Sequence, residues 1–399
     1  MRNFVLFFLI LLIIDFIFSQ LFFLDILYKK KITAFKNDIT YRILNEQYLY
    51  TFKKNSSFMA RYNYEFANID YQINTNNLGL RDSSVRDLET EKVYSIVIGD
   101  SFVEGSGLNY EDTLVGILNK KLNFEIFKKF EFLNAGVASY SPYIYKEKIK
   151  SLINSNKWLN VNSVVILYDK SDVGDNLKYI DKPNSFPIIK REYKNPKKEK
   201  LLNDFKNFNF GSILTEQTMI GIFYRDVLGA SIEKLIQNIK FRKILADKYD
   251  LNFFEIGKEE LNTMYATHQY EWLQKYFYDP LWEKEGKKSI DFAFENFIEL
   301  KSFLNERKID LYIVIYPWPF DLLDDNIRKK YLNYLNKKFS ENDLNNLIVY
   351  DEFLKEDVSQ SIFKYYLPKD VHFNRKGNFI LSEKIFYTLS KNNLVEVFE

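Results

Sequence analysis

Residues 93–102 read VYSIVIGDSF, a short apolar run that ends in a Gly-Asp-Ser turn. A run of this kind, closed by a turn signal, predicts a buried strand. Similar runs recur at residues 130–134, 164–168, 311–316 and 347–350, with helical patterns such as 114–122 and 290–305 between or after them. Strands that alternate with helices indicate a mostly parallel sheet with helices on both faces, and therefore an α/β fold.

The residues that follow these strands carry the chemistry that the sequence offers. In open parallel sheets, ligands bind outside the carboxyl ends of the strands, so residues at that edge share one crevice. Asp100, Asp172 and Trp318 are predicted to contact the substrate there. Asp370 and His372 come after the last strand and precede a helical pattern at residues 376–389, so they are expected at the same edge. The residues that we expect there are Asp100, Ser101, Gly136, Ser171, Asp172, Trp318, Asp370 and His372.

Ser101, His372 and Asp370 form a candidate catalytic group. A serine hydroxyl is a poor nucleophile at neutral pH unless an imidazole accepts its proton and a third group holds that imidazole in one tautomer. Side chains at positions i and i+2 of an extended segment point the same way, so Asp370 is able to reach the ring of His372. The chain has two histidines, and the other, His268, lies in a helical pattern that predicts a packed or surface residue.

Composition argues against several other kinds of site. The 399 residues carry a formal net charge of +2, with 56 basic and 54 acidic residues interspersed, so no basic face indicates a nucleic-acid partner. Cysteine is absent, which excludes disulfides and thiolate chemistry, and the presence of two histidines argues against a zinc site. We therefore expect catalysis without a metal ion or another cofactor.

Residues 1–30 are predicted to anchor the chain in a membrane. Residues 3–28 are nearly continuous apolar sequence, long enough to cross a bilayer as a helix, although Asp15 and Asp25 interrupt them. A cleaved signal peptide is the alternative, but the small residues of a cleavage site are missing. Lys29–Lys31 follow the apolar run, and by the positive-inside rule they favour a cytoplasmic location for the rest of the chain.

The remainder is predicted to be one large domain with an insertion, because no linker rich in proline, glycine or serine divides it. We place a membrane-proximal linker region at residues 31–70 and the α/β domain at residues 71–399, with an insertion at about 177–290. An insertion of this length indicates either a lid or substrate-binding segment or a set of solvated helices. Its Lys-rich run at residues 190–200 is typical of a solvated face.

With these residues in place, the chain resembles the SGNH, or GDSL-type, hydrolase superfamily, in particular its bacterial membrane-anchored members. The resemblance covers about residues 71–389 and includes the lead-in INTNNLGLRD at residues 73–82. It implies a flavodoxin-like three-layer α/β/α sandwich with a mostly parallel five-stranded sheet. It also implies Ser101 in GDSF as the nucleophile, Asp370 and His372 in DVHFN as the orienting acid and the base, and Ser101 and Gly136 as backbone donors of an oxyanion hole.

The third block departs from the family pattern. It usually reads Gly-x-Asn-Asp, with an asparagine that donates to the oxyanion, whereas this chain has DKSD at residues 169–172. Ser171 stands where the asparagine is expected and is the third oxyanion donor that we predict, with Asn176 as a fallback. Loss of one such donor lowers the rate by about a hundred- to a thousandfold unless another donor substitutes. A serine hydroxyl has one proton to donate and reaches less far than an amide.

The resemblance implies a serine esterase or acyl-transfer enzyme that acts on an acylated small molecule or polysaccharide. For an anchored member, O-acetyl groups of an envelope polysaccharide are the expected substrate, which requires the domain to lie outside the cytoplasm, against the indication from Lys29–Lys31. An O-acyltransferase, a lipase or thioesterase, and a glycan-binding or assembly protein with an impaired site are the alternatives. Trp318, Tyr316 and Tyr140 either stack on a sugar ring or pack in the core.

Overall fold

The computed structural model describes residues 2–18, 42–45, 47–64, 67–122, 129–177, 179–180, 239, 258–268 and 271–392. The chain divides into two compact units. One comprises Met1–Thr40 with Pro187–Ile256, and the other comprises Tyr41–Phe186 with Gly257–Glu399. Helix α1 (Arg2–Phe18) belongs to the first unit, and the sheet with the elements around it belongs to the second.

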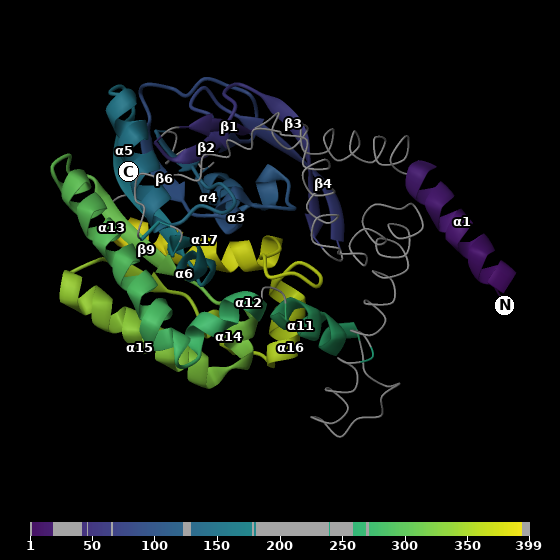
Figure 1. Ribbon diagram of the computed structural model, residues 1–399. Helices are drawn as coiled ribbons and strands as arrows, with labels where there is room; N and C mark the ends of the chain where they lie inside the picture. Colours follow the sequence, from purple (N-terminus) through teal and green to yellow (C-terminus); the bar gives the residue numbers. More distant parts are fainter. Residues whose placement is uncertain are drawn as a thin grey trace. The chain divides into compact units, whose positions relative to one another are not determined.

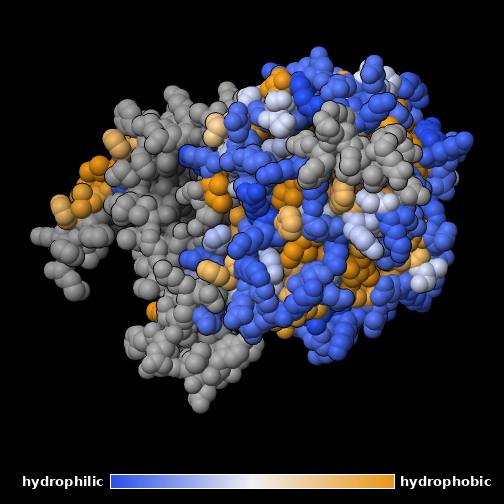
Figure 2. Space-filling model, turned by 180° about the vertical axis from the view of Figure 1, so that it is seen from behind, coloured by the Kyte–Doolittle hydropathy of each residue, from blue (hydrophilic) through white to orange (hydrophobic). Residues whose placement is uncertain are grey.

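Helix α1 consists almost entirely of apolar residues. Those of its side chains that the structure describes include Phe7, Ile13 and Ile17, which are exposed and belong to a hydrophobic surface (Figure 2). Among the described residues, no helix combines the length and the apolarity that crossing a bilayer requires. The anchor predicted at residues 1–30 continues beyond α1 into residues 19–30, which lie outside the described ranges. The membrane anchor therefore stays a prediction.

The second unit is built on a sheet of eight strands in the order β10-β9-β8-β6-β7-β5-β4-β3. Figure 1 labels four of them, β3, β4, β6 and β9. The strands predicted from the sequence are neighbours in it and pair in parallel: β6 (Val93–Ile98), β7 (Phe130–Asn134), β8 (Asn160–Tyr168), β9 (Asp310–Ile315) and β10 (Asn346–Ile348). Most of their side chains are buried on both faces, which is why each reads as a continuous apolar run. The predicted α/β fold with a mostly parallel sheet is confirmed.

Successive side chains of the parallel strands enter two different cores. Ile96 and Ile98 of β6 share a core with residues of α5 (Pro142–Ser155), α13 (Lys287–Asn305) and α15 (Asp325–Asn342). Val97 shares the other core with α4 (Leu114–Lys121) and α17 (Arg375–Lys391). The alternation follows from the two-residue repeat of a strand, and it gives a helical layer on each face of the sheet.

The other described helices are mostly short and connect these layers. These helices are α3 (Ser101–Glu104), α6 (Ser171–Asn176), α11 (Lys258–His268), α12 (Glu271–Gln274), α14 (Pro319–Leu323) and α16 (Val358–Tyr365), with 3₁₀ or π turns at Tyr110–Asp112, Lys275–Phe277, Trp282–Gly286 and Asp351–Leu354.

Two features that the sequence suggested fall within the predicted insertion. The Lys-rich run at residues 190–200 lies outside the described residues. His268 is the last residue of α11.

Three antiparallel strands extend the sheet beyond the five predicted ones: β3 (Ser57–Tyr64), β4 (Ala67–Thr75) and β5 (Arg81–Asp82). A separate hairpin precedes them, formed by β1 (Arg42–Asn45) and β2 (Leu49–Phe52). The predicted five-stranded sheet is thus the parallel part of a larger one. Residues 42–64, which the sequence suggested as part of a linker region, form three of these strands in the second unit.

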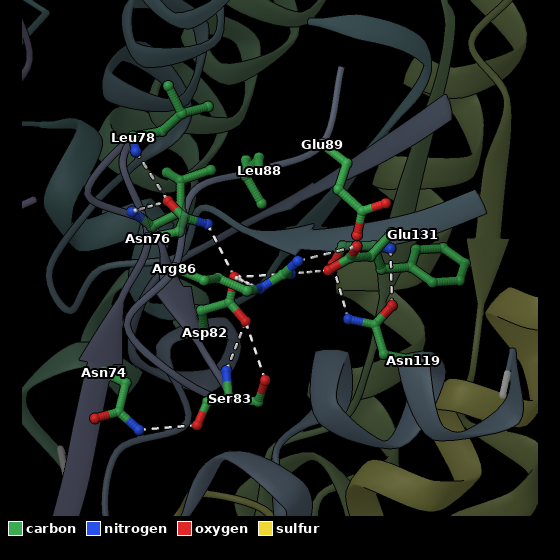
Figure 3. A network of polar contacts seen from close by, with 12 residues as sticks. Asn74, Asn76, Leu78, Asp82, Ser83, Arg86, Leu88, Glu89, Asn119 and Glu131 are labelled. Carbon is green, nitrogen blue, oxygen red and sulfur yellow. Dashed lines mark hydrogen bonds and ion pairs between the residues drawn. The ribbon is translucent and has the colours of Figure 1, made fainter. Parts of the chain in front are cut away.

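The lead-in block at residues 73–82 forms a buried polar network (Figure 3). Asn76 Oδ1 accepts the backbone N–H of Leu78 at 3.0 Å, and Asn76 Nδ2 donates to Asp82 Oδ2 at 3.1 Å. Arg86 donates to Asp82 and also pairs with Glu131 on β7. The network fixes the bend between β4 and β5 against the parallel part of the sheet.

Arg81, in the same block, is fully buried and holds the segment that follows α3. Its guanidinium donates to the backbone carbonyls of Glu104, Gly105 and Leu108. Because a guanidinium offers several donors in a fixed plane, one side chain satisfies carbonyls that leave the short helix in different directions. The arginine of the lead-in block therefore supports the helix that begins at Ser101.

Candidate active site

Ser101 is the first residue of α3, directly after β6. Asp100 caps the helix, with its Oδ1 accepting the Phe102 N–H at 2.9 Å. Gly99 permits α3 to pack closely on the end of β6, because a Cβ there would lie 2.5 Å from Val103 Cγ2. As the first helical residue, Ser101 has a backbone N–H with no acceptor inside the helix, and its side chain is half-buried.

His372 and Asp370 reach Ser101 from the segment between α16 and α17. His372 Nε2 lies 2.8 Å from Ser101 Oγ, although 271 positions separate the two residues. His372 Nδ1 lies 2.6 Å from Asp370 Oδ1, and the same carboxylate oxygen accepts the backbone N–H of His372 at 2.8 Å. The structure thus brings together the three side chains that the sequence suggested as nucleophile, base and orienting acid.

The electrostatics of the pair suit a general base. Burial of the His372 ring favours the neutral form, but the charge of Asp370 and its hydrogen bond outweigh burial and raise the pKa of His372 above its usual value. Burial likewise opposes ionisation of Asp370, yet His372 and the hydrogen bonds to the carboxylate leave its pKa lowered. Phe102 packs on the imidazole, with ring centroids 4.7 Å apart, and excludes water from one face.

Tyr62 adds a fourth group that the sequence did not single out. Its hydroxyl donates to Asp370 Oδ2 at 2.6 Å and lies 3.1 Å from His372 Nδ1. Its ring stands edge-on to the imidazole, with centroids 5.6 Å apart and planes at 84°. Tyr62 lies on β3, and among 29 tyrosines no local pattern marks it.

Gly136 lies close to α3, but its backbone donor is already used. Its N–H donates to Asn134 Oδ1 at 3.1 Å, and the residue is buried. A Cβ at this position would lie 2.5 Å from Val103 Cβ and 2.6 Å from the Glu104 nitrogen. In this structure Gly136 therefore permits the close approach of the loop after β7 to α3, and its N–H does not point to an open oxyanion site.

The loop that contains Gly136 is held by a residue pair that the sequence did not suggest. Glu104, on α3, accepts the Ala138 N–H at 2.7 Å and receives Arg42 Nη2 on both carboxylate oxygens, at 3.2 and 3.1 Å. The hydroxyl of Tyr50, from the same hairpin as Arg42, donates to the carbonyl of Ala138. The β1–β2 hairpin thus fixes the loop against the helix of the candidate nucleophile.

Ser171 also has its proton engaged. Its Oγ lies 2.6 Å from Asp169 Oδ1 and 3.2 Å from Asp100 Oδ2, and its backbone N–H donates to Asp169 Oδ1 at 2.8 Å. The hydroxyl is therefore near Ser101 through Asp100, but it is directed to a carboxylate. Asn176, the predicted fallback, is buried and donates to the carbonyl of Ser289 at 3.3 Å.

The three residues predicted to contact substrate lie beneath the surface. Asp172 is fully buried and accepts the Tyr145 hydroxyl at 2.9 Å. Trp318 is 6% exposed and donates its indole N–H to Asp169 Oδ2 at 3.0 Å. Asp100 is 5% exposed. Their contacts are with protein groups under the nucleophile, and Trp318 presents no open face to a sugar ring.

Burial and neighbouring negative charge raise the pKa of two of these carboxyl groups, Asp100 and Asp172. Burial, followed by the charge of Asp169, raises the pKa of Asp100 to about 7. Burial, followed by the charges of Asp169 and Asp100, raises the pKa of Asp172 well above its usual value. In the described part of the chain, no group of histidine, cysteine and carboxylate side chains is arranged to hold a metal ion.

The comparisons with known proteins give matches in structure alone. No protein-family model matches the chain, and no curated protein matches it. An alpha/beta hydrolase from the metagenome of Lake Arreo in Spain is similar with a TM-score of 0.37 and 10% identity, over 74% of this chain and 94% of that one.

Two further structures are similar to the same degree. A member of the lipolytic G-D-S-L family from Veillonella parvula has a TM-score of 0.35 and 13% identity, over 75% of this chain and 99% of its own. The lipase/acylhydrolase of Enterococcus faecalis has a TM-score of 0.35 and 10% identity, over 75% and 96% of the two chains. The assignment of chemistry therefore rests on the geometry of the site itself.

Proposed function

We propose that the chain is a serine esterase or acyl-transfer enzyme of the SGNH hydrolase type. The observation that carries the proposal is the hydrogen-bonded series from Ser101 Oγ to His372 Nε2 at 2.8 Å and from His372 Nδ1 to Asp370 Oδ1 at 2.6 Å. A hydroxyl, an imidazole and a carboxylate in this order are the groups that nucleophilic acyl transfer requires. The topology that the resemblance implied supports the same assignment.

In the proposed reaction, Ser101 Oγ attacks the ester carbonyl carbon and its proton passes to His372 Nε2. Asp370 holds the Nδ1 proton and stabilises the imidazolium that forms. The tetrahedral intermediate collapses when His372 returns the proton to the leaving alcohol oxygen, which leaves an acyl ester on Ser101. Water, or a sugar hydroxyl, then attacks that ester, and the same proton steps in reverse order release the acid or the new ester.

Labelling by a fluorophosphonate tests this function, because the probe reacts with activated serines. We expect the purified full-length chain to be labelled, and both Ser101→Ala and His372→Ala to lose labelling. Ser302→Ala, at an exposed position of α13, is the matched control and is expected to label like the wild type. A folded wild-type chain that resists the probe at every pH would contradict the enzymatic function.

For the substrate, we propose O-acetyl groups of an envelope polysaccharide, with an outward-facing domain held by the apolar N-terminal segment. The support is the apolar sequence at residues 3–28 and the resemblance to anchored members of the family. Release of acetate from an acetylated polysaccharide, or its transfer to a sugar acceptor, separates the esterase from the acyltransferase. The location is tested by fusing the C-terminus to a reporter that works only in the cytoplasm. Reporter activity in this fusion would exclude the proposed substrate.

A glycan-binding or assembly protein is the second candidate function. The observation in its favour is that Gly136 N–H and Ser171 Oγ, two of the predicted oxyanion donors, are engaged inside the protein. Under this alternative, Ser101→Ala would leave glycan acylation in cells unchanged, while deletion of the whole chain would alter it. The enzymatic proposal predicts that both changes have the same effect.

A further inference from the structure

Asp100 touches the candidate nucleophile directly, and its two carboxyl oxygens have different surroundings. Oδ1 accepts the Phe102 N–H at 2.9 Å. Oδ2 lies 3.2 Å from Ser101 Oγ and 3.2 Å from Ser171 Oγ. A carboxylate oxygen between two hydroxyls is satisfied if either hydroxyl donates a hydrogen bond to it. The protonation of Asp100 therefore depends on which acceptors the Ser101 and Ser171 hydroxyls choose.

The Ser171 proton points to Asp169. The distance from Ser171 Oγ to Asp169 Oδ1 is 2.6 Å, against 3.2 Å to Asp100 Oδ2, and a hydroxyl has one proton to give. Asp169 is an acceptor on both oxygens, since the hydroxyl of Tyr316 and the indole N–H of Trp318 donate to its Oδ2 at 2.8 and 3.0 Å. The contact between Ser171 Oγ and Asp100 Oδ2 therefore lacks a proton unless Asp100 supplies it.

The Ser101 proton points to His372. With a proton on Nδ1 for Asp370, the neutral ring has a lone pair at Nε2, and Ser101 Oγ lies 2.8 Å from it. This arrangement is the one that a general base needs. The contact between Ser101 Oγ and Asp100 Oδ2, at 3.2 Å, then lacks a proton as well.

We propose that Asp100 is a neutral carboxylic acid in the active enzyme, and that its Oδ2–H is a catalytic hydrogen-bond donor to the reacting oxygens at Ser101. This inference rests on the proposed function and assigns it a further catalytic residue. One proton on Oδ2 turns one of the two remaining contacts into a hydrogen bond, and the proposal assigns it to Ser101 Oγ. It also supplies a donor at the nucleophile, where Gly136 N–H and Ser171 Oγ are engaged elsewhere.

The surroundings of Asp100 support the neutral form. Its pKa is raised to about 7, mainly because burial disfavours the charge and secondly because Asp169 repels it. His372, from the segment before α17, acts in the opposite direction. The titratable groups that interact electrostatically with Asp100 are Asp169 after β8, Asp172 on α6, His372, Tyr145 on α5 and Tyr316 after β9.

The acid form has a definite use in the reaction. When Ser101 Oγ bonds to the carbonyl carbon, its own proton moves to His372 Nε2, and the carbonyl oxygen becomes an oxyanion. Asp100 keeps its proton throughout and donates a hydrogen bond, together with the Ser101 backbone N–H. A neutral donor in a dry site stabilises the developing charge, whereas a carboxylate at the same place would repel it.

A competing distribution of the same protons defines the inactive state. If the proton of Asp100 moves to His372, Ser101 Oγ receives a hydrogen bond from Nε2–H and donates to the Asp100 carboxylate. The imidazolium then has no lone pair for the Ser101 proton, and attack cannot be assisted. The two distributions differ in two measurable respects, the protonation of His372 Nε2 and the protonation of the Asp100 carboxyl.

Asp100→Asn is the decisive variant, because an asparagine reproduces the proposed pattern at every pH. Its Oδ1 accepts the Phe102 N–H, and its Nδ2 donates where the acid is proposed to donate. The companion variant Asp100→Ala lacks the donor. Hydrolysis of p-nitrophenyl acetate and inactivation by a fluorophosphonate are measured for the wild type and both variants from about pH 5.5 to about pH 9.

The wild type is expected to lose activity as pH rises through about 7, where Asp100 ionises. Asp100→Ala is expected to be slower by about 100-fold at its optimum, as for loss of an oxyanion donor. Asp100→Asn should recover most of that loss and show no decline on the alkaline side. Its acid limb should stay close to that of the wild type, because the neutral acid form of Asp100 has no charge that would raise the pKa of His372.

The inference fails if Asp100→Asn is as slow as Asp100→Ala at every pH, or if wild-type activity stays constant from about pH 7 to about pH 9.

Two readouts do not depend on activity. The infrared difference between wild type and Asp100→Asn near pH 6 should contain the C=O band of a protonated carboxyl, and its absence would overturn the inference. With two histidines in the chain, ring-nitrogen NMR should show His372 Nε2 unprotonated in the active range. A chain that shows the carboxyl band but no reaction with the probe would contradict the proposed function and leave the protonation of Asp100 established.

Discussion

The hydroxyl of Tyr62 donates a 2.6 Å hydrogen bond to Asp370 Oδ2, across 308 positions of sequence. This bond joins β3, an antiparallel strand at the edge of the sheet, to the carboxylate that holds His372. Both oxygens of Asp370 are thereby occupied, Oδ1 by His372 and Oδ2 by Tyr62. Rotation of the carboxylate would break two bonds at once, so Tyr62 acts as a positioning residue for the base.

Tyr62→Phe is expected to lower kcat for p-nitrophenyl acetate by about 10- to 100-fold with KM unchanged, since a hydrogen bond to a charged group contributes about 1.5–3 kcal/mol. The low-field NMR signal of the proton between His372 and Asp370 should broaden or disappear in the variant. Tyr94→Phe is the matched control, because its hydroxyl makes a 2.7 Å bond to the carbonyl of Glu89, at the opposite end of β6 from Ser101. Equal losses of kcat in the two variants would refute a positioning role.

Arg42→Ala is expected to destabilise the second unit and loosen the loop after β7. Glu104 is 1% exposed, so removal of Arg42 leaves a buried carboxylate with the Ala138 N–H as its described partner, at a cost of about 3 kcal/mol. Urea unfolding of the full-length chain measures the change. Arg61→Ala is the control, since both partners in the Arg61–Asp70 pair are more than half exposed, and it should leave the unfolding midpoint unchanged.

Gly136→Ala is expected to cost about 1–3 kcal/mol of stability, because its Cβ would press on the α3 backbone 2.6 Å away and the structure has to shift. Thermal unfolding and fluorophosphonate labelling should both be affected, since the shift moves the helix that begins at Ser101. Ser139→Gly provides the comparison in the same loop. Ser139 has a φ of 64°, a region that glycine adopts without strain, so this variant should not lose stability.

Lys148 is expected to make the stability of the protein depend on pH in the alkaline range. Its Nζ donates to the carbonyl of Ala135 at 3.0 Å inside the core, and burial lowers the pKa of Lys148 to about 7. In the unfolded chain the group binds its proton up to about pH 10, so between about pH 7 and about pH 10 the unfolded state holds more protons. Stability should therefore rise with pH by up to about 1.4 kcal/mol per pH unit.

Lys148→Met should abolish that rise, as measured by urea unfolding at several pH values. Lys150→Met, on the same helix and only partly buried, should retain the wild-type dependence. A wild-type stability that is flat or falls from about pH 7 to about pH 10, relative to Lys148→Met, would contradict the assignment.

Much of the parallel sheet was predictable because each of its strands reads as one local pattern. The run at residues 93–98 is apolar at almost every position, since helices cover both of its faces. The strands β3 to β5 were not predicted. Their side chains alternate between buried and exposed positions, as in Tyr71 and Gln72, and Asn74 and Arg81 obscure the strand pattern.

The candidate site was predictable to the extent that its chemistry lies in short motifs. Ser101 in its turn and Asp370 two residues before His372 are local signals, and the order of strands along the chain places them at one edge. The functions expected of Gly136 and Ser171 depend on the direction of one proton each. Those directions are set by Asn134 and Asp169, close by in sequence, but nothing in the sequence states which acceptor a donor chooses.

The sequence by itself determined the α/β fold and the identity of the candidate nucleophile, base and acid, because apolar periodicity and residue chemistry are properties of short segments. Only the tertiary structure decided which groups surround these residues. It places the Tyr62 hydroxyl on Asp370, pairs Arg42 with Glu104 on α3, and buries the Asp100 carboxyl next to Ser101. The physical reason is that hydrogen bonds and pKa shifts depend on distances of about 3 Å and on burial, and both arise when segments far apart in the chain pack together.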